Sequence, residues 1–513
     1  MNYLLGIDIG TTSTRSIIIN KEGSLIASSN KDYPLITPRS GWTEQNPEDW
    51  WDATVFTIKD VLSKSHISSS KIDCIGLTGQ MHGSIFLNNK GEVIRPAILW
   101  NDQRTFKQCE EIYNIFGYKE FIRLSYNKAL PGFTAPKILW LREEEPDNFN
   151  KIYKILLPKD YIRYKLSGSF ITDVSDASGT SLMDVHNRCW SDQILNGLKI
   201  NKNLLPDIYE STEITSKTNK ESSRITGLID GIPIAGGGSD NTTGAIGSGI
   251  IKEGLISDSI GTSGVVFASS DKPVYDKEGR IHCWCHSVPG KWLLVVATLS
   301  AAGSFKWYYD SFGTSKNIEN IYSDLSGYKL LDKQAENVSP GSEGLIFLPY
   351  LSGERYLTGV NSHYGDPHAR GVFFGLSYIH TQDHFVRSIM EGVAFSQLDC
   401  LSILKTQNIS SEKVVLFGGG AKSNIWRQII ADVFNTKIVT LNIKEGPAYG
   451  AALIAGVGVG IYSSIEDAVG RIIREVNEIS PLEKNVKKYR KLYNIYKSLY
   501  NDLKVHFKEL AEI

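Results

Sequence analysis

The sequence is poor in the features that mark secreted or nucleic-acid-binding proteins. Six cysteines in 513 residues are too few for a disulfide framework and fit a reducing compartment. The 55 basic and 56 acidic side chains give a net charge of −1, and no stripe of Lys and Arg is interleaved with aromatic residues. Nothing therefore attracts nucleic acid electrostatically. Because the first residues lack a basic segment followed by an apolar core, we expect no secretory signal and a cytoplasmic location.

Long apolar runs are also missing. The longest run of small and apolar residues, from Ala448 to Ile461, is too short to span a bilayer and contains four glycines. The preceding Glu445-Gly446-Pro447 offers a turn and a proline near the first turn of a helix. We therefore predict a buried helix here and no membrane segment.

The length of the chain predicts two domains. A chain of 513 residues exceeds the size of one ordinary hydrophobic core. We place the division between residues 246 and 247, which gives an N-terminal domain of residues 1–246 and a C-terminal domain of residues 247–513. At the end of the chain, apolar and aromatic residues recur at helical spacing between Lys484 and Phe507, which predicts a terminal helix with one buried stripe.

The most informative segment reads Gly-Gly-Gly-Ser-Asp-Asn, from Gly236 to Asn241. Three glycines without side chains let two reactants approach the backbone closely, while Asp240 can accept a proton from an attacking group. That arrangement suits a kinase. The alternative is an ordinary glycine-rich turn that ends in Asp.

The amino terminus offers a second candidate element. The sequence from Leu4 to Ile19 predicts a strand, a tight turn and a second strand, with Gly10 and a group of hydroxyl side chains in the turn. An anion would fit at this turn, and Asp8 could hold a hydrated Mg²⁺ at the end of the first strand. The alternative is a solvated hairpin with a capping Asp.

This hairpin has an echo in the second half of the chain. Residues 254–268 again run from a strand through a Gly-Thr-Ser turn into an apolar strand. Residues 72–79 and 413–420 form a second echo, in which each strand runs into glycine. Each half carries the two features in the same order, which indicates two similar domains that face a shared nucleotide.

With these segments, the chain resembles the FGGY carbohydrate kinases of the actin-like, ribonuclease-H-like ATPase superfamily, and among them the xylulokinases. The most specific match is Gly-Gln-Met-His-Gly at 79–83 followed by Leu-Trp-Asn-Asp-Gln-Arg at 99–104. Further matches are Gly132–Lys137, Leu157–Tyr161, Asp176–Thr180, Gly371–Leu376 and Met390–Gly392. The resemblance implies an α/β fold of two ribonuclease-H-like domains flanking a catalytic cleft, and ATP-dependent phosphorylation of D-xylulose with Mg²⁺. It also implies a homodimer.

The resemblance assigns roles to individual residues. Asp240 is the expected general base, and Asp8 and Asp240 are the expected metal-associated carboxylates. The expected sugar contacts are Gln80, Met81, His82, Trp100, Asp102, Asp240 and Asn241. The expected nucleotide contacts are Thr11, Thr12, Arg15, Gly261, Thr262, Ser263, Lys306, Gly419, Gly420, Ala421 and Asn424, with a helix that begins after Gly420.

Physical reasoning supports a carboxylate base in such a reaction. Phosphoryl transfer passes through a loose transition state, so a weak base suffices. Asp240 needs no raised pKa for this role, because an aspartate near the ordinary value of about 3.9 is ionised at neutral pH and can accept a proton. His82 is predicted to contact the sugar, the alternative being a structural histidine.

Two segments depart from this pattern or lie outside it. The loop from Tyr356 to His368 is longer than in related chains, which predicts either a tolerated insertion or a contribution to nucleotide access or dimer contact. The run His282-Cys283-Trp284-Cys285-His286 has poor spacing for zinc, so we predict a strand with the cysteines on one face and the other residues on the opposite face.

Other functions remain open at this point. The chain could phosphorylate another ketose or polyol, such as ribulose, L-xylulose, gluconate or glycerol. It could instead be a filament-forming or chaperone-like ATPase, or an inactive sugar-binding relative. A filament-forming or chaperone-like ATPase needs no sugar-facing segment 80–82, and an inactive relative would be expected to have lost Asp8 or Asp240. This chain has the segment and both carboxyl groups.

Overall fold

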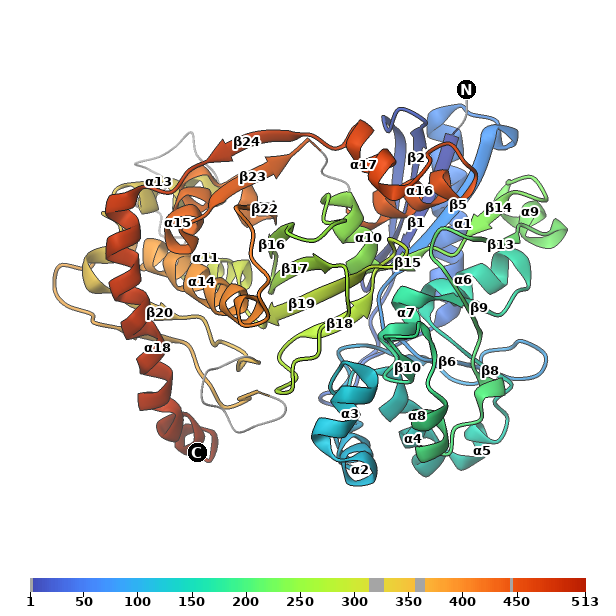
Figure 1. The fold of residues 1–513 in the computed structure, drawn as a ribbon, viewed down its shortest axis with the longest axis horizontal. Coiled ribbons are helices and arrows are strands. Elements are labelled where there is room, and N and C mark those ends of the chain that lie inside the picture. The colour runs from blue at the N-terminus through green and yellow to red at the C-terminus, as the bar shows by residue number, and fades with distance from the viewer. Residues whose placement is uncertain (1–2, 313–326, 356–364, 443–445) are drawn as a thin grey trace. The chain divides into compact units, whose positions relative to one another are not determined.

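The structure, a computed structural model, describes residues 3–312, 327–355, 365–442 and 446–513 (Figure 1). The chain forms two compact units, neither of which is continuous in sequence. Unit 1 comprises Met1–Glu253, Ser269–Leu294 and Ile443–Arg474, and unit 2 comprises Gly254–Ala268, Val295–Asn442 and Glu475–Ile513. The division of the chain into an N-terminal domain of residues 1–246 and a C-terminal domain of residues 247–513 stays a prediction.

The first half of the chain contains both strands and helices. The strands are β1 (Tyr3–Ile9), β2 (Ser13–Asn20), β3 (Leu25–Asp32), β4 (Glu44–Gln45), β5 (Ile72–Gly79), β6 (Ile85–Leu87), β7 (Ala97–Ile98), β8 (Lys154–Leu156), β9 (Ile171–Asp173), β10 (Met183–Asp184), β11 (Cys189–Trp190), β12 (Asp207–Tyr209), β13 (Ile214–Lys217), β14 (Pro233–Ala235) and β15 (Gly238–Ser239). The helices are α1 (Pro47–Ser65), α2 (Phe106–Phe116), α3 (Tyr118–Ser125), α4 (Thr134–Glu144), α5 (Pro146–Phe149), α6 (Pro158–Ser167), α7 (Val174–Ser178), α8 (Asp192–Gly197), α9 (Lys220–Thr226) and α10 (Asp240–Gly247).

The second half adds a further sheet and longer helices. Its strands are β16 (Ile256–Ile260), β17 (Gly264–Ser270), β18 (His282–Cys285), β19 (Trp292–Thr298), β20 (Ile346–Leu348), β21 (Val372–Phe374), β22 (Lys413–Gly418), β23 (Lys437–Leu441) and β24 (Glu475–Ile479). Its helices are α11 (Ala302–Phe312), α13 (Tyr328–Glu336), α14 (Gln382–Lys405), α15 (Asn424–Phe434), α16 (Pro447–Gly458), α17 (Ile465–Ile472) and α18 (Glu483–Ala511).

The two predicted echoes are confirmed in the pairing of the strands. In unit 1, β1 pairs antiparallel with β2 and parallel with β5, within a sheet of order β13-β14-β5-β1-β2-β3. In the second sheet, β16 likewise pairs antiparallel with β17 and parallel with β22. Each half therefore presents one hydroxyl-rich hairpin turn beside the carboxyl end of a neighbouring parallel strand.

The buried helix predicted from Ala448 onward is confirmed as α16, which belongs to unit 1 and packs on β1 and β5. Glycines on the strands permit this close packing. A Cβ atom on Gly6 would lie 2.1 Å from the carbonyl oxygen of Ala448, and one on Gly76 would lie 1.9 Å from that of Ala451. Since real Cβ atoms do not approach so closely, the small residues on both partners fix this helix directly on the sheet.

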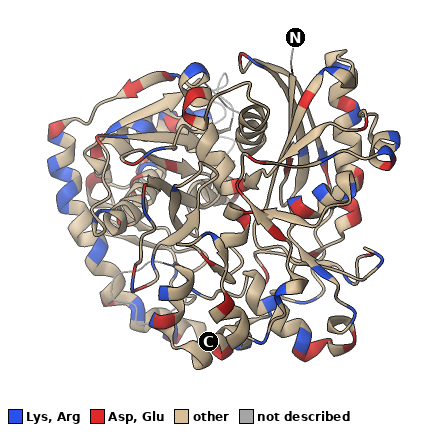
Figure 2. Cartoon of the chain, turned by 45° about the vertical axis from the view of Figure 1, so that its right-hand side comes forward, with Lys and Arg blue, Asp and Glu red and all other residues tan. Residues whose placement is uncertain are grey.

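The terminal helix is confirmed as α18, which buries Tyr489, Tyr496, Leu499 and Tyr500 on one side. In the view of Figure 2, basic and acidic residues are both scattered over the outer helices and loops, in line with the near-neutral composition. Among the described residues, no helix combines the length and apolarity that a membrane crossing requires. Most of the long loop Tyr356–His368 lies outside the described residues.

Candidate active site

The glycine-rich segment places Asp240 at the first turn of a helix. β15 pairs with the carboxyl end of β5, and α10 begins at Asp240 with Ser239 as its N-cap. The segment needs its glycines: Gly237 has a φ of +73°, and a Cβ on Gly236 would lie 2.3 Å from the carbonyl oxygen of Glu210. The backbone thus delivers one carboxylate at the edge of the sheet with few side chains around it.

Asp8 and Asp240 interact electrostatically within unit 1. Asp8 lies on β1 directly opposite Arg15 on β2. Burial raises the pKa of Asp8 to about 7, against the opposing effect of the Arg15 charge. Burial and the negative charge of Asp8 together raise the pKa of Asp240 to about 7. The raised pKa of Asp240 was not anticipated from the sequence, because desolvation and the second carboxylate arise only from the fold.

The first hairpin turn is held from inside the unit. The amide of Gly10 donates to the carbonyl oxygen of Ser13 at 3.0 Å and closes the turn. The carbonyl oxygen of Gly10 accepts from the hydroxyl of Tyr33 and, at 3.3 Å, from the side-chain amide of Gln80. Thr12 remains exposed at the tip. The backbone of the turn is thus fixed while the Thr12 side chain is exposed.

His82 adopts an unusual backbone conformation for a residue other than glycine. Its φ of +66° lies in the left-handed region. Its carbonyl oxygen accepts a hydrogen bond from Nζ of Lys137 at 2.7 Å and one from Oγ1 of Thr134 at 3.3 Å. Its Nδ1 lies 2.7 Å from the carbonyl oxygen of Gly179, so Nδ1 carries the proton, and the ring stacks on Phe133 at 4.1 Å. Several partners therefore hold both backbone and ring in one orientation.

Four of the predicted sugar-side residues come together in unit 1. The side-chain amide of Asn241 lies 3.2 Å from Sδ of Met81 and 2.9 Å from Oδ1 of Asp240. A Cβ on Gly179 would lie 2.6 Å from Met81 and 2.8 Å from His82, so all three residues meet at this point. The structure thus joins segment 81–82, which follows β5, to the start of α10.

The other three predicted sugar contacts, Gln80, Trp100 and Asp102, make contacts with other parts of the protein. Gln80 is buried, and its amide donates to the carbonyl oxygen of Gly10 and to Gln45. Asp102 is fully buried and binds Arg104 at 2.7 to 3.0 Å and the amide of Thr43 at 2.7 Å. These two side chains are therefore engaged in the protein interior. Trp100 is 41% exposed, and its indole donates to the hydroxyl of Thr11 at 2.9 Å.

The second hairpin turn, Gly261–Ser263, belongs to unit 2. The amide of Gly261 donates to the carbonyl oxygen of Ser263 at 3.1 Å, while Thr262 and Ser263 are exposed. The amide of Ala302 at the start of α11 donates to the carbonyl oxygen of Gly261 at 2.8 Å. Further along α11, Lys306 is exposed and pairs with Asp310 at 2.6 Å. The turn is therefore fixed by a helix start, as the first turn is fixed by glutamine side chains.

The predicted adenosine segment follows β22 in unit 2. Gly420 is buried, and a Cβ there would lie 2.6 Å from Ile260, so a glycine is needed beside β16. A short 3₁₀ turn covers Gly420–Lys422, and α15 begins at Asn424. The helix thus begins a few residues later than expected, with Ser423 as its N-cap. Gly419 and Asn424 are exposed and Ala421 is half-buried.

Family models match both halves of the chain. The N-terminal domain of the FGGY family of carbohydrate kinases matches residues 3–247, and its C-terminal domain matches residues 257–459. The chain belongs to the FGGY family of carbohydrate kinases. It is an ATP-dependent sugar kinase, and the predicted fold class of two ribonuclease-H-like, actin-like ATPase domains is confirmed.

Individual relatives cover nearly the whole kinase. It is 36% identical to the xylulose kinase of Bacillus subtilis (strain 168) over 504 residues, 98% of each chain, and 38% identical to that of Lactococcus lactis subsp. lactis over 521 residues, 100% of this chain and 99% of the relative. The structure of a xyloylose kinase from Brucella ovis is similar, with a TM-score of 0.88 and 31% identity over 98% of this chain and all of the other. The gluconokinase of Bacillus subtilis is 30% identical over 513 residues, 100% of this chain and 98% of the relative.

Sequence reasoning missed several residues around the candidate sugar site of the FGGY kinase. Phe133 stacks on His82, Lys137 holds its carbonyl oxygen, and Trp284 on β18 lies 5.9 Å from its ring. Burial lowers the pKa of Lys137 well below its usual range. The alternating pattern in residues 282–286 could have pointed to Trp284, because it placed this residue on the same face of the predicted strand as His282. The strand is confirmed, and its His282 and Trp284 rings stack at 5.4 Å.

Proposed function

We propose that this kinase transfers the terminal phosphoryl group of ATP to the terminal hydroxyl of D-xylulose, with Asp240 as the general base. The observation that carries this proposal is the meeting of Met81, His82 and Asn241 beside Asp240. Xylulose kinases among the relatives support the choice of sugar. A carboxylate that can take up a proton, beside one apolar and two polar side chains, suits a substrate whose hydroxyl group accepts the phosphoryl group.

The proposed sugar contacts divide into residues that touch the sugar and residues that shape the pocket. With Nδ1 of His82 bound to the carbonyl oxygen of Gly179, Nε2 is the ring nitrogen proposed to contact a sugar hydroxyl. Met81 offers an apolar wall for carbon atoms, and Asn241 offers an amide. Because the carboxylate of Asp102 is engaged with Arg104, we assign Asp102, with Gln80 and Trp100, to shaping the pocket.

The nucleotide is proposed to bind through the two turns and the segment after β22. Exposed Thr12, Thr262 and Ser263 offer hydroxyl groups and backbone amides to phosphates, with Arg15 as a cation. Other proposed contacts are Thr11, Gly261, Lys306, Gly419, Gly420, Ala421 and Asn424. In this proposal residues 1–246 bind mainly the sugar and residues 247–513 mainly the nucleotide, in a cytoplasmic homodimer.

Mg²⁺ fits the carboxylates that the kinase offers. Oδ1 of Asp8 is buried without a hydrogen-bond partner, and Asp8 acts electrostatically on Asp240. The described residues contain no group of three or more His, Cys, Asp or Glu side chains arranged for a metal. Two carboxylates suit Mg²⁺, which keeps most of its waters and also binds substrate phosphates. We propose that Asp8 and Asp240 hold the ion, which would neutralise developing charge on the phosphates.

A panel of acceptors tests the proposed substrate. Purified protein with MgATP is expected to release ADP with the highest kcat/KM for D-xylulose among D-xylulose, L-xylulose, D-ribulose, L-ribulose, D-fructose, glycerol and gluconate. Gluconate is the second candidate, because the gluconokinase relative also spans the whole chain. A higher kcat/KM for gluconate would move the assignment there. Sugar-independent ATP turnover that rises with protein concentration would favour a filament-type ATPase instead.

The pH dependence of kcat/KM, which reports the free enzyme, tests the proposed base. Since the pKa of Asp240 is raised to about 7, the ionised, proton-accepting form increases as pH rises through about 7. We therefore expect kcat/KM to increase from pH 5.5 to 8 with an apparent pKa near 7. The measurement is initial ADP release at D-xylulose and MgATP concentrations well below KM, with the coupling enzymes in excess at each pH. A flat profile across this range would contradict a desolvated Asp240 base.

A further inference from the structure

The segment that carries Asp240 offers almost no side chains by which its position could be fixed. Gly236, Gly237 and Gly238 have none, and the carboxylate of Asp240 accepts hydrogen bonds from the amide and the side chain of the adjacent Asn241. On one side, Gly238 and Ser239 pair with β5. The position of the carboxylate therefore depends on backbone contacts on the other side of the segment.

Ser175 on α7 supplies that contact. Its Oγ accepts a hydrogen bond from the amide of Ser239 at 2.9 Å, one residue before Asp240. The same Oγ donates to Oδ2 of Asp173 at 2.6 Å. A hydroxyl group has a single proton, so donation to the carboxylate leaves the lone pairs for the Ser239 amide. Asp173 thereby fixes the direction in which Ser175 acts, and the two bonds strengthen each other.

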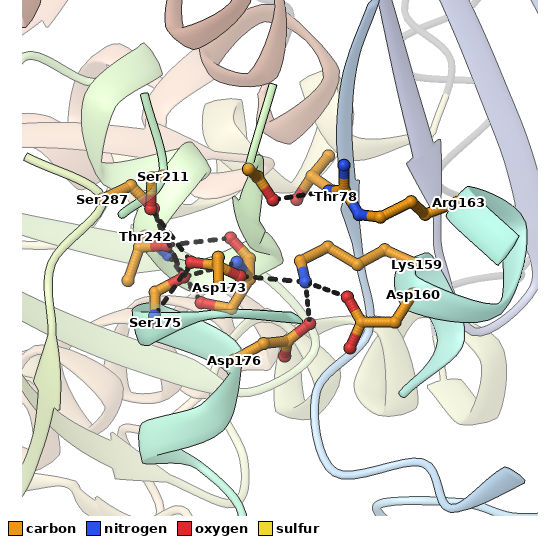
Figure 3. A network of polar contacts seen from close by, with 12 residues as sticks. Thr78, Lys159, Asp160, Arg163, Asp173, Ser175, Asp176, Ser211, Thr242 and Ser287 are labelled. Carbon is orange, nitrogen blue, oxygen red and sulfur yellow. Dashed lines mark hydrogen bonds and ion pairs between the residues drawn. The ribbon is translucent and has the colours of Figure 1, made fainter. Parts of the chain in front are cut away.

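Asp173 is in turn held by a buried ionic cluster, shown in Figure 3. Nζ of Lys159 lies 2.9 Å from Asp173, 2.5 Å from Asp160 and 3.0 Å from Asp176. All four side chains are fully buried. Asp173 also accepts from Oγ of Ser211 at 2.9 Å. One ammonium group on α6 therefore orders the carboxylate that orients Ser175.

The same helix also binds the glycine segment directly. The guanidinium of Arg163, one turn after Lys159 on α6, donates to the carbonyl oxygen of Ala235 at 2.8 Å and to that of Gly236 at 2.6 Å. Arg163 is fully buried. Two cations of α6 thus act on the two ends of the glycine segment. Arg163 binds its beginning directly, and Lys159 acts on its end through Asp173 and Ser175. A purely space-filling core would need neither charge at this place.

We propose that Lys159, Asp173 and Ser175 form a positioning relay that fixes the Asp240 carboxylate for proton acceptance. The relay rests on the proposed function of Asp240 as the base. None of its three members touches substrate in this proposal. Its effect is to hold the backbone at Ser239, so its loss should lower the rate of the chemical step more than the affinity for sugar or ATP.

The test compares two serines that bind the same carboxylate oxygen. Ser175→Ala removes the acceptor of the Ser239 amide, whereas Ser211→Ala removes only a donor to Asp173. We expect Ser175→Ala to lower kcat by about 10- to 100-fold with little change in either KM, because small misplacement of a reacting group costs that much. Ser211→Ala should lose thermal stability but keep kcat close to wild type. Asp173→Asn is a second variant and should reproduce the kcat loss.

The split between kcat and KM is the readout that a merely structural role would not change, because a general loss of structure would affect both. Equal kcat losses in Ser175→Ala and Ser211→Ala would overturn the relay, as would wild-type kcat in both Ser175→Ala and Asp173→Asn. Asp240→Asn is measured alongside: if it keeps wild-type turnover, the proposed base fails, whatever the relay does.

Discussion

Replacement of Asp240 by Asn is expected to lower kcat for D-xylulose by about a hundredfold to ten-thousandfold, the usual contribution of a general base. The amide retains the shape of the carboxyl group but cannot accept the proton of the attacking hydroxyl. KM for the sugar should change little, since Met81, His82 and Asn241 remain in place. The measurement is coupled ADP release over a range of both substrates. Asp230→Asn, an exposed carboxyl group of the same unit, is the matched control and should keep full activity.

The stability of the Asp240→Asn variant distinguishes loss of the base from loss of the fold. In the native protein the pKa of Asp240 is raised to about 7 from its usual 3.8. Between these values the native state binds more protons than the unfolded state, so this group makes stability fall as pH rises from about 4 to about 7. The Asn variant lacks that dependence. It should therefore be at least as stable as the wild type at pH 8 in urea unfolding, and wild-type turnover in a stable variant would rule out Asp240 as the base.

Much of the fold could be predicted because its determinants are local in sequence. The hairpin at Gly10, its echo at Gly261 and the strands that run into glycine at Gly79 and Gly418 each combine apolar strands with a turn that contains glycine. Local patterns of this kind do not depend on distant contacts. The composition of the two units was not predicted, because segments 269–294 and 443–474 join unit 1 through tertiary packing.

In the candidate site, too, the sequence predicted residue types but not the contacts that they make. The residue types of Met81, His82, Asp240 and Asn241 suggested a sugar pocket, and the structure brings them together. The pKa of Asp240 could not be predicted, since it depends on burial and on Asp8, which lies far away in sequence. Engagement of Asp102 with Arg104 and of Lys137 with His82 was likewise invisible, because a sequence does not show which partner occupies a buried polar group.

Replacement of Lys159 by Met is expected to destabilise the protein by about 3 to 5 kcal/mol, the usual cost of leaving buried charges without their partner. The ammonium group contacts three fully buried carboxyl groups, and burial raises the pKa values of Asp160 and Asp176 even with Lys159 present. Met fills a similar volume, so the loss reports charge more than packing. Urea unfolding followed by circular dichroism measures it.

The sign of the pH dependence makes the Lys159→Met prediction specific. Without the ammonium, the folded pKa values of Asp160 and Asp176 rise further above their unfolded values, so the native state of the variant gains protons as pH falls. The destabilisation should therefore be larger at pH 8 than at pH 5. Lys202→Met, which breaks an exposed ion pair with Asp192, is the matched control and should change neither stability nor its pH dependence. A loss in Lys159→Met that is equal at both pH values would show that Lys159 contributes by packing, and the carboxyl groups around it would then be neutral in the folded protein.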